Sequence, residues 1–313
     1  MTNIHPTAII DPTSEVGRDV EIGPYSVIGP RVRIGDGCAL HSHVTITGPS
    51  VVGADNVFYP YSVIGADPQD LKFHGENSSL VIGDRNQIRE HVTIHRGTDN
   101  GGGVTEVGSD NLIMVAAHIA HDCVVGSHCV IANMVMLGGH AVIEDCANIG
   151  GGTGVHHYTT IGKLSFVAGL SRVKKDVPPF MKVEGDPLEV RGVNTIALAR
   201  RQYSEDEISG LKEAYKRLFH HHHRSNGTAA PVVTTTVRNG SRGSNRPPSK
   251  GRPSQAIECH PPMSVTIEEL MSEYAHLTTV TDLCRSLSQS AEGVHGRSRE
   301  KTREDSKFAT QPK

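Results

Sequence analysis

The sequence has no tryptophan among its 313 residues, and it has only six phenylalanines and seven tyrosines. An aromatic layer therefore does not fill its core, and aliphatic side chains must supply the buried surface. No segment approaches the roughly 18 consecutive apolar residues of a membrane-spanning helix, and residues 1–17 lack the basic start and apolar run of a signal peptide. These absences predict a cytoplasmic protein without a membrane span.

An excess of positive charge is also missing, since 31 lysines and arginines face 34 aspartates and glutamates. The formal net charge of −3 gives no reason to expect a nucleic-acid partner. The six cysteines include no C-x-x-C pair, and Cys123, Cys129 and Cys146 lie among small apolar residues. We expect reduced thiols that have a structural role.

What the sequence does contain is an aliphatic or aromatic residue at every sixth position. One series runs from Ile4 to Ile64 and resumes from Ile82 to Ile94, and a second series, shifted by one residue, runs on to Val173. A period of six fits neither a helix, which repeats every 3.6 residues, nor a single strand, which repeats every two. It is typical of a β-solenoid of hexapeptide repeats, in which each aliphatic side chain points to the axis of a triangular prism.

Two insertions interrupt this period. Residues 67–80 are inserted without a change of phase, whereas residues 96–106 shift the phase by one residue. A solenoid places insertions on its surface, so we expect two exposed loops. Loops on a rigid scaffold often carry binding residues.

Four histidines can be placed by counting. With three hexads to a coil, every third hexad falls on the same face, and three such hexads carry His121, His140 and His156. Coils stack about 4.8 Å apart, so these imidazoles are expected to rise along one edge of the prism. His118 ends the preceding hexad and is expected at the neighbouring corner.

This cluster is compatible with two kinds of chemistry. His121 is followed by Asp122, and an imidazole oriented by a carboxylate can act as a general base at neutral pH. Three neutral imidazoles could instead hold zinc, as in hexapeptide proteins that resemble the gamma-class carbonic anhydrases. A hexapeptide scaffold without catalytic activity is a third possibility.

Several motifs resemble one enzyme family, the acyl-[acyl-carrier-protein]:UDP-N-acetylglucosamine O-acyltransferases. They include QDLK at residues 69–72, HIAHD at residues 118–122, and GVN followed by paired arginines within residues 192–201. The resemblance covers residues 4–219. It implies a left-handed parallel β-helix of hexapeptide repeats with a C-terminal α-helical extension.

The resemblance also implies an activity, the first step of lipid A biosynthesis. An (R)-3-hydroxyacyl group would pass from the phosphopantetheine arm of acyl carrier protein to the 3-hydroxyl of UDP-N-acetylglucosamine. The enzyme would be a homotrimer with its active sites between adjacent prisms, and it would need neither a metal nor a further cofactor. The resemblance leaves open the acyl length and whether the natural sugar carries a hydroxyl or an amine at its 3-position.

The resemblance assigns roles to individual residues. His121, supported by Asp122, matches the general base, and the N–H group of Gly139 matches the group that stabilises the oxyanion. Gly169 matches the position that sets acyl length, and its small size favours long chains. Substrate binding is assigned to Asp70, Lys72, His118, His140, His156, His157, Asn194, Arg200 and Arg201. The chain departs from the family at His157, Ile196 and Pro187, which weakens the assignment of the nucleotide contacts.

Beyond the repeats the pattern becomes helical. Residues 204–219 have a capped, amphipathic pattern, and nearby basic residues could dock an acidic carrier protein: Arg200, Arg201, Lys212, Lys216 and Arg217. Residues 264–287 also have a helical pattern. The predicted divisions are 1–190 for the β-helix, 191–219 for the first helical part, 220–262 for a disordered linker, 263–288 for further helices, and 289–313 for a disordered tail.

Overall fold

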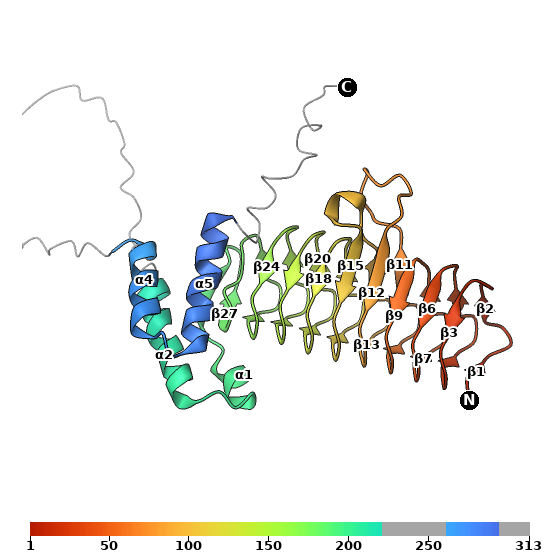
Figure 1. Cartoon of the computed structure of the whole chain (residues 1–313), viewed down its shortest axis with the longest axis horizontal. Coiled ribbons are helices and arrows are strands. Elements are labelled where there is room, and N and C mark those ends of the chain that lie inside the picture. Colours follow the sequence, from red (N-terminus) through yellow and green to blue (C-terminus); the bar gives the residue numbers. More distant parts are fainter. Residues whose placement is uncertain (221–260, 294–313) are drawn as a thin grey trace, which may run out of the picture.

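The computed structural model describes residues 1–220 and 261–293. It shows a long prism of stacked coils, with the N-terminus at one end and a group of helices at the other (Figure 1). Each coil contributes one short strand to each of three parallel sheets, which we call sheets A, B and C.

Successive strands of a sheet are three apart along the chain, and the last two strands of sheet A depart from this interval. Sheet A contains, in order, β1 (Asn3–Ile4), β4 (Glu21–Ile22), β7 (Ala39–Leu40), β10 (Val57–Phe58), β13 (Gln87–Ile88), β16 (Leu112–Ile113), β19 (Val130–Ile131), β22 (Asn148–Ile149), β25 (Phe166–Val167), β27 (Met181–Glu184) and β28 (Glu189–Val193). Sheet B contains β2 (Ile9–Ile10), β5 (Val27–Ile28), β8 (Thr45–Ile46), β11 (Val63–Ala66), β14 (Thr93–His95), β17 (His118–Ile119), β20 (Met136–Leu137), β23 (Gly154–Val155) and β26 (Arg172–Val173). Sheet C contains β3 (Glu15–Val16), β6 (Val32–Ile34), β9 (Ser50–Val52), β12 (Ser79–Ile82), β15 (Val104–Val107), β18 (Val124–Val125), β21 (Val142–Ile143) and β24 (Thr160–Ile161).

The six-residue period of the sequence is the period of the core. Residues at this spacing are buried along the axis from Ile22 to Val173. In sheet A, for example, Ile113 pairs with Ile131 of the next coil. Ile4 is 44% exposed, and its strand β1 pairs with one neighbour, β4. The predicted aliphatic core is therefore correct except at the open end.

The corners of the prism use an uncommon backbone conformation. The residue three positions after each core residue has a positive φ in nearly every coil, including Tyr25 at 59° and His140 at 61°. Such an angle costs an L-residue roughly 1–2 kcal/mol. The cost is offset by a hydrogen bond to the adjacent coil, as when the His140 N–H group donates to the His121 carbonyl at 3.0 Å.

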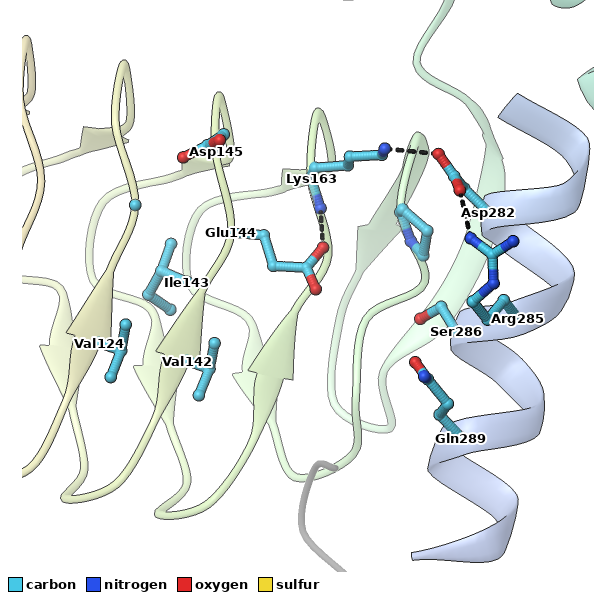
Figure 2. Close-up of a pocket in the computed structure, with 12 residues that line it drawn as sticks. Val124, Val142, Ile143, Glu144, Asp145, Lys163, Asp282, Arg285, Ser286 and Gln289 are labelled. Atoms are coloured by element: carbon cyan, nitrogen blue, oxygen red, sulfur yellow. Dashed lines mark hydrogen bonds and ion pairs between the residues drawn. The ribbon is translucent and has the colours of Figure 1, made fainter. Parts of the chain in front are cut away.

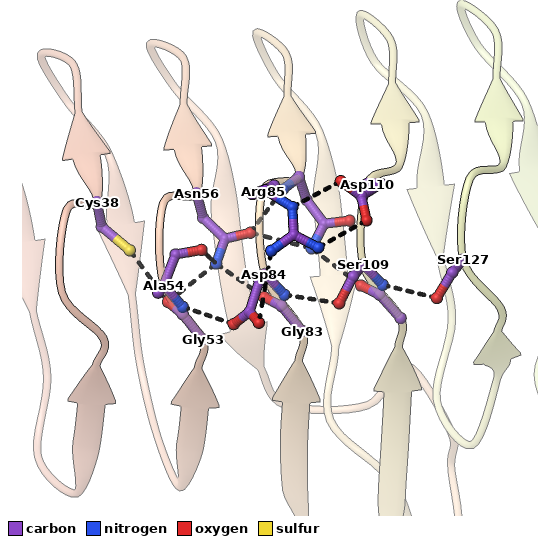
Figure 3. Close-up of polar contacts among 12 residues, drawn as sticks. Cys38, Gly53, Ala54, Asn56, Gly83, Asp84, Arg85, Ser109, Asp110 and Ser127 are labelled. Carbon is purple, nitrogen blue, oxygen red and sulfur yellow. Dashed lines mark hydrogen bonds and ion pairs between the residues drawn. The ribbon is translucent and has the colours of Figure 1, made fainter.

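A ladder of buried side chains stiffens one corner (Figure 3). Asn56 accepts a hydrogen bond from the backbone N–H of Asn86 at 2.9 Å, and Asn86 accepts one from the N–H of Asn111 at 2.9 Å. The N–H of Cys129 donates to Asn111 at 2.7 Å. Each side chain thus satisfies a buried donor of the next coil, as buried polar groups require.

The cysteines of the described residues are free thiols, as the sequence predicts. Burial raises the pKa of the Cys123 and Cys129 thiols to about 12. A buried thiol that stays protonated is a poor nucleophile, which agrees with a structural role.

The two insertions lie beside each other on one side of the prism (Figure 1). The prediction of exposed loops is only partly correct. Leu71 is fully exposed, but Leu80 is buried where the chain enters β12. The second insertion contains the 3-10 turn η1 (Asp99–Gly101) and three buried residues, Gly97, Thr98 and Thr105. Parts of both insertions therefore pack against the prism.

The C-terminal part begins after the antiparallel hairpin of β27 and β28. Its helices are α1 (Thr195–Arg200), α2 (Glu205–Tyr215), the π-helix η2 (Lys216–His220), α4 (Met263–Glu273) and α5 (Thr278–Glu292). Ser204 and Glu207 form the capping box expected from the sequence. No helix among the described residues has the length and hydropathy needed to cross a bilayer.

Three sequence-based boundaries differ from the structure. β28 reaches Val193, so the helical part begins after residue 191. The helical pattern of residues 264–287 divides into α4 and α5, because α4 packs against α5 and η2 while α5 packs against α2, so that both helices bury apolar side chains in one cluster. Gly293, at a φ of 79°, ends α5, so residues 289–292 are helical rather than part of a disordered tail. The rest of the predicted tail and nearly all of the predicted linker lie outside the described residues.

Ion pairs join the helices to one another and to the prism. Lys163 of the prism lies 2.6 Å from Asp282 of α5, beside a groove of about 400 Å³ between sheet C and this helix (Figure 2). Arg217 lies 2.8 Å from Glu269 and 2.8 Å from Glu273 of α4. Arg217 therefore connects η2 to α4. Its charge is paired within the chain, so Arg217 is less available to the predicted docking patch for acyl carrier protein.

Candidate active site

Three of the predicted histidines lie where β17, β20 and β23 leave sheet B. The three strands pair in register, with Ile119 beside Leu137 and Leu137 beside Val155. The next corner carries the residues that follow these strands in the chain: His121, His140 and His156. The count of three hexads per coil therefore brings these imidazoles to one edge.

His118 does not lie at the neighbouring corner, and this prediction was wrong. It is the first residue of β17. Because Ile119 points to the axis, the alternation of a strand directs His118 outward on sheet B. Its Nδ1 atom lies 2.7 Å from the hydroxyl of Thr93 in the coil before. Burial, and then the neighbouring His121, lowers the pKa of His118.

The centre of the cluster is a pair formed by His121 and Asp122. The Nδ1 atom of His121 lies 2.7 Å from Oδ2 of Asp122, whose side chain is fully buried. A proton on Nδ1 donates to this carboxylate and leaves the lone pair of Nε2 free to accept another proton. His121 therefore has the arrangement of an oriented general base.

His140 occupies the next coil beside this pair. Its Nε2 atom lies 3.7 Å from the same Asp122 oxygen, and its ring is perpendicular to that of His121 at 5.2 Å. On its other side the ring stacks on Tyr158 at 4.3 Å. Stacking fixes the plane of His140, so this ring forms a rigid wall next to His121.

Gly139 packs directly against the His121 ring. A Cβ atom built on Gly139 would lie 2.6 Å from Cε1 and 2.7 Å from Nε2 of His121. A side chain at this position would therefore displace the ring. In the part of the chain that the structure describes, no acceptor takes the Gly139 N–H, so this donor is available.

The first insertion brings a second carboxylate to His121. Oδ2 of Asp70 lies 3.9 Å from Nε2 of His121 and 3.4 Å from Nζ of Lys72. Burial opposes the ionisation of Asp70, but the N–H group and ammonium of Lys72, together with His121, outweigh burial and lower the pKa of this carboxyl. Asp70 is thus a charged neighbour of the proton-accepting atom.

A cavity of about 730 Å³ lies along sheet B in front of these groups. Its lining includes four residues that the sequence singled out: His118, His121, Gly139 and His156. It also includes Arg172 and Lys174, which sequence reasoning missed. Arg172 lies three hexads after Gly154, and Lys174 lies three hexads after His156. Counting three hexads to a coil, as for the histidines, could therefore have found both cations. Asp186 lies 3.6 Å from Arg172 and 3.5 Å from Lys174.

Other predicted site residues lie outside this lining. His157 is adjacent to His156, with ring centroids 3.8 Å apart. Gly169 is exposed at the corner after β25, where a Cβ atom would lie 3.1 Å from the Gly151 oxygen. Both residues lie within a few positions of cavity-lining residues in the chain, but neither lines the cavity.

The residues predicted to bind the nucleotide lie beyond the last coil. Asn194 caps α1, and its side chain accepts from the Ala197 N–H at 3.4 Å and donates to the Leu164 carbonyl at 2.8 Å. Arg200 and Arg201 are exposed at the end of the same helix. Within a single chain these residues do not join the histidine cavity.

Among the residues that the structure describes, no three imidazoles lie close enough together for the zinc site of the alternative. The side chains whose ligand atoms lie within 4.8 Å of one another are His121, Asp122 and His140. His121 already uses Nδ1 to bind Asp122, and His118 uses Nδ1 at Thr93. Two imidazoles and a carboxylate bonded to one of them suit proton transfer better than a three-histidine zinc site.

Comparisons with known proteins agree with this geometry. The chain matches the family model "Udp N-acetylglucosamine O-acyltransferase; Domain 2" over residues 176–243, and the bacterial transferase hexapeptide model over residues 13–48 and 105–139. It is 46% identical over 219 residues to an acyl-[acyl-carrier-protein]–UDP-N-acetylglucosamine O-acyltransferase of Saccharophagus degradans, with 70% of this chain and 85% of that protein covered.

Solved structures with the same fold include two bacterial relatives. LpxA from Acinetobacter baumannii is 37% identical with a TM-score of 0.76, and LpxA from Bacteroides fragilis is 30% identical with a TM-score of 0.77. In both comparisons 92% of this chain and 97% of the other chain are covered. The fold is therefore a left-handed parallel β-helix with a C-terminal helical part, and the chain belongs to the acyl-[acyl-carrier-protein]–UDP-N-acetylglucosamine O-acyltransferase family.

Proposed function

We propose that this enzyme transfers an (R)-3-hydroxyacyl group from acyl carrier protein to the 3-hydroxyl of UDP-N-acetylglucosamine, the first step of lipid A biosynthesis. The observation that carries the proposal is the His121–Asp122 pair at 2.7 Å beside the cavity, in a chain 46% identical to a named enzyme of this activity. A cytoplasmic location belongs to the same proposal.

The reaction follows from the atoms around His121. Nε2 removes the proton of the sugar hydroxyl as its oxygen attacks the thioester carbonyl. The N–H group of Gly139, a residue that packs against the His121 ring, stabilises the negative oxygen of the tetrahedral intermediate. Collapse of the intermediate expels the phosphopantetheine thiolate, which takes the proton from the His121 imidazolium. The products are the acylated sugar and the free thiol, and His121 regains its starting form.

The remaining predicted residues bind and orient the two substrates. Lys72 is suited to a phosphate oxygen, and His118 and His156 line the wall that would contact the sugar. Asn194, Arg200 and Arg201 lie too far along the chain to join the same cavity, which supports a homotrimer in which an adjacent protomer contributes them. Gly169 leaves space at a corner for a long acyl chain.

The function is tested by product analysis and by removal of the base. With UDP-N-acetylglucosamine and a panel of hydroxyacyl carrier proteins, mass spectrometry should detect a 3-O-acylated sugar. His121→Ala should lower kcat by roughly 10²- to 10⁴-fold, because proton transfer by a positioned base contributes that much. His128→Ala removes an exposed corner histidine and is the matched control. Wild-type protein that forms no acylated sugar, or His121→Ala with normal kcat, would contradict the proposal.

A further inference from the structure

The second insertion of the prism folds onto the buried carboxylate of Asp122. The backbone N–H of Thr98 donates to Oδ1 of Asp122 at 2.7 Å, and the hydroxyl of Thr98 donates to Oδ2 at 2.7 Å. Thr98 is 3% exposed. The loop that shifts the phase of the repeats therefore reaches the carboxylate that binds His121.

Three donors hold this carboxylate. Oδ2 receives the Thr98 hydroxyl and the Nδ1–H group of His121, while Oδ1 receives the Thr98 N–H. Two short bonds from one residue to both oxygens define the plane of the carboxylate. The direction in which Asp122 presents its lone pair to His121 is thus set by Thr98.

The backbone of η1 closes over the same group. A Cβ atom built on Gly101 would lie 2.0 Å from Cγ of Asp122 and 2.3 Å from each of its oxygens. Gly101 therefore permits a close approach that any other residue would prevent. Thr105, at the end of the insertion, accepts a hydrogen bond from the Asp122 N–H at 2.8 Å, so it holds the backbone but not the carboxylate.

We propose that Thr98 is a positioning residue for catalysis, which acts through Asp122 on the base His121. This proposal rests on the proposed function, because it needs His121 to be the proton acceptor. Without the hydroxyl, Asp122 keeps the Thr98 N–H at Oδ1 and the His121 N–H at Oδ2 but loses one of its two donors at Oδ2, so the plane of the carboxylate is held less firmly. The imidazole is then no longer held at the angle at which Nε2 faces the substrate.

The hydroxyl also limits how strongly Asp122 attracts a proton to His121. A carboxylate that loses a donor binds an imidazolium more strongly. The other titratable groups near His121 are the Asp70–Lys72 pair, His140, His118 and His95. A Thr98 variant leaves all of them in place, so a change in the pH–rate profile of that variant reports on Asp122.

Thr98→Val tests the proposal, since valine keeps the shape and the backbone N–H group but removes the hydroxyl. We expect kcat to fall roughly 10- to 100-fold, the effect of losing one hydrogen bond to a charged group, while KM for UDP-N-acetylglucosamine changes less than about twofold. The acidic limb of the pH–rate profile should move to higher pH. Thr98→Ser, which restores a hydroxyl, should recover most of kcat.

A double-mutant cycle separates positioning from loop stability. In an Asp122→Ala background, Thr98→Val should cause no further loss of kcat, because the two residues act as a unit. Thr105→Val is the matched control, since it removes a threonine hydroxyl of the same insertion that does not touch the carboxylate. It should lower the thermal midpoint without moving the acidic limb. Gly101→Ala, which displaces Asp122 from the other side, should lower kcat as Thr98→Val does.

Three results would overturn the inference. They are a Thr98→Val enzyme with wild-type kcat and pH profile, a rise in KM alone, or a loss of kcat that persists in the Asp122→Ala background. If wild-type enzyme is active and His121→Ala is not, such a result rejects the role of Thr98 alone. An inactive wild-type enzyme would instead reject the proposed function.

Discussion

At the scale of single residues, burial separates the histidines of the site into different roles. His95 is 5% exposed, its Nδ1 atom has no partner among the described residues, and its ring lies 4.8 Å from that of His118. Burial, and then the rings of His118 and His121, lowers the pKa of His95 to about 4. His95 is therefore neutral at neutral pH, and of these three rings it is His121 that lies beside buried Asp122.

This protonation state predicts an acid sensitivity of the fold. As the pH falls through 6.5, the unfolded chain protonates His95, whereas the folded chain does so only near pH 4. Folding stability should therefore fall between these two values, by up to about 3 kcal/mol from this residue. Denaturant unfolding at pH 7 and pH 4.5 should show a smaller loss for His95→Met than for wild type. Equal losses would mean that His95 is not held neutral.

At the scale of elements, the two insertions function as one unit. Arg96, at the start of the second insertion, is only 12% exposed and forms an ion pair with Asp67 at the start of the first. Its guanidinium also donates to the Gly65 carbonyl at 3.1 Å and lies 5.6 Å from the centre of the Phe73 ring. Arg96 thus contacts the first insertion on both sides of the residues that approach His121.

Removal of this anchor should loosen substrate binding. Arg96→Met keeps the length of the side chain but loses the ion pair and the hydrogen bond, so Asp70 and Lys72 are held less firmly. We expect KM for UDP-N-acetylglucosamine to rise roughly tenfold, equivalent to about 1.4 kcal/mol, with a smaller change in kcat.

Arg31→Met is the matched control for this experiment. Arg31 is exposed and touches the far end of the same loop, where it donates to Asn77 at 3.2 Å. Its replacement should change KM less than twofold, as expected for an exposed polar contact. A tenfold rise in KM for both variants would show that general loosening of the loop, rather than the anchor at Arg96, affects binding.

At the scale of the whole molecule, the prism is a rigid frame whose coils contact mainly their neighbours. The histidine cavity lies along the half of this frame nearer the helices, from β14 to β26, while Arg200 and Arg201 lie in the helical part beyond its last coil. Large apolar side chains near the cavity are also exposed, including Met134 at 60%, Met136 at 55% and Leu170 at 84%. An adjacent protomer would cover such a surface.

A shared active site predicts complementation between inactive variants. Three chains of 33.6 kDa should give a particle of about 100 kDa in light scattering. His121→Ala and the double variant Arg200→Ala with Arg201→Ala should each be inactive. When they are co-expressed in equal amounts and assemble at random, about a third of the sites in mixed trimers, and about a quarter of all sites, combine intact residues from both chains, so about a quarter of wild-type activity should return. A monomeric mass, or no recovery in verified mixed trimers, would contradict a shared site.

Sequence reasoning was most successful where the repeat itself carries the information. Counting in units of three hexads placed His121, His140 and His156 on one edge, because each coil repeats the local geometry of the last. The same reasoning placed His118 at a corner, which was wrong. The six-residue period does not show at which residue a strand begins, and His118 is the first residue of β17. The assignment of Asn194 to ligand binding stays a prediction, and within the chain its amide donates to the Leu164 carbonyl and accepts from the Ala197 N–H.

The sequence alone determined the regular spacing of buried residues, the prism and the placement of three imidazoles at one edge, because hexapeptide coils depend on neighbours at a constant separation. Only the tertiary structure decided that Thr98 holds Asp122, that Arg96 holds the first insertion, and that Arg217 joins two helices. These contacts join segments at irregular separations in the chain. An insertion has no repeat, so counting cannot predict which residues of the prism it will contact. For that reason the repeats determine the frame, whereas folding of the loops onto the frame completes the site.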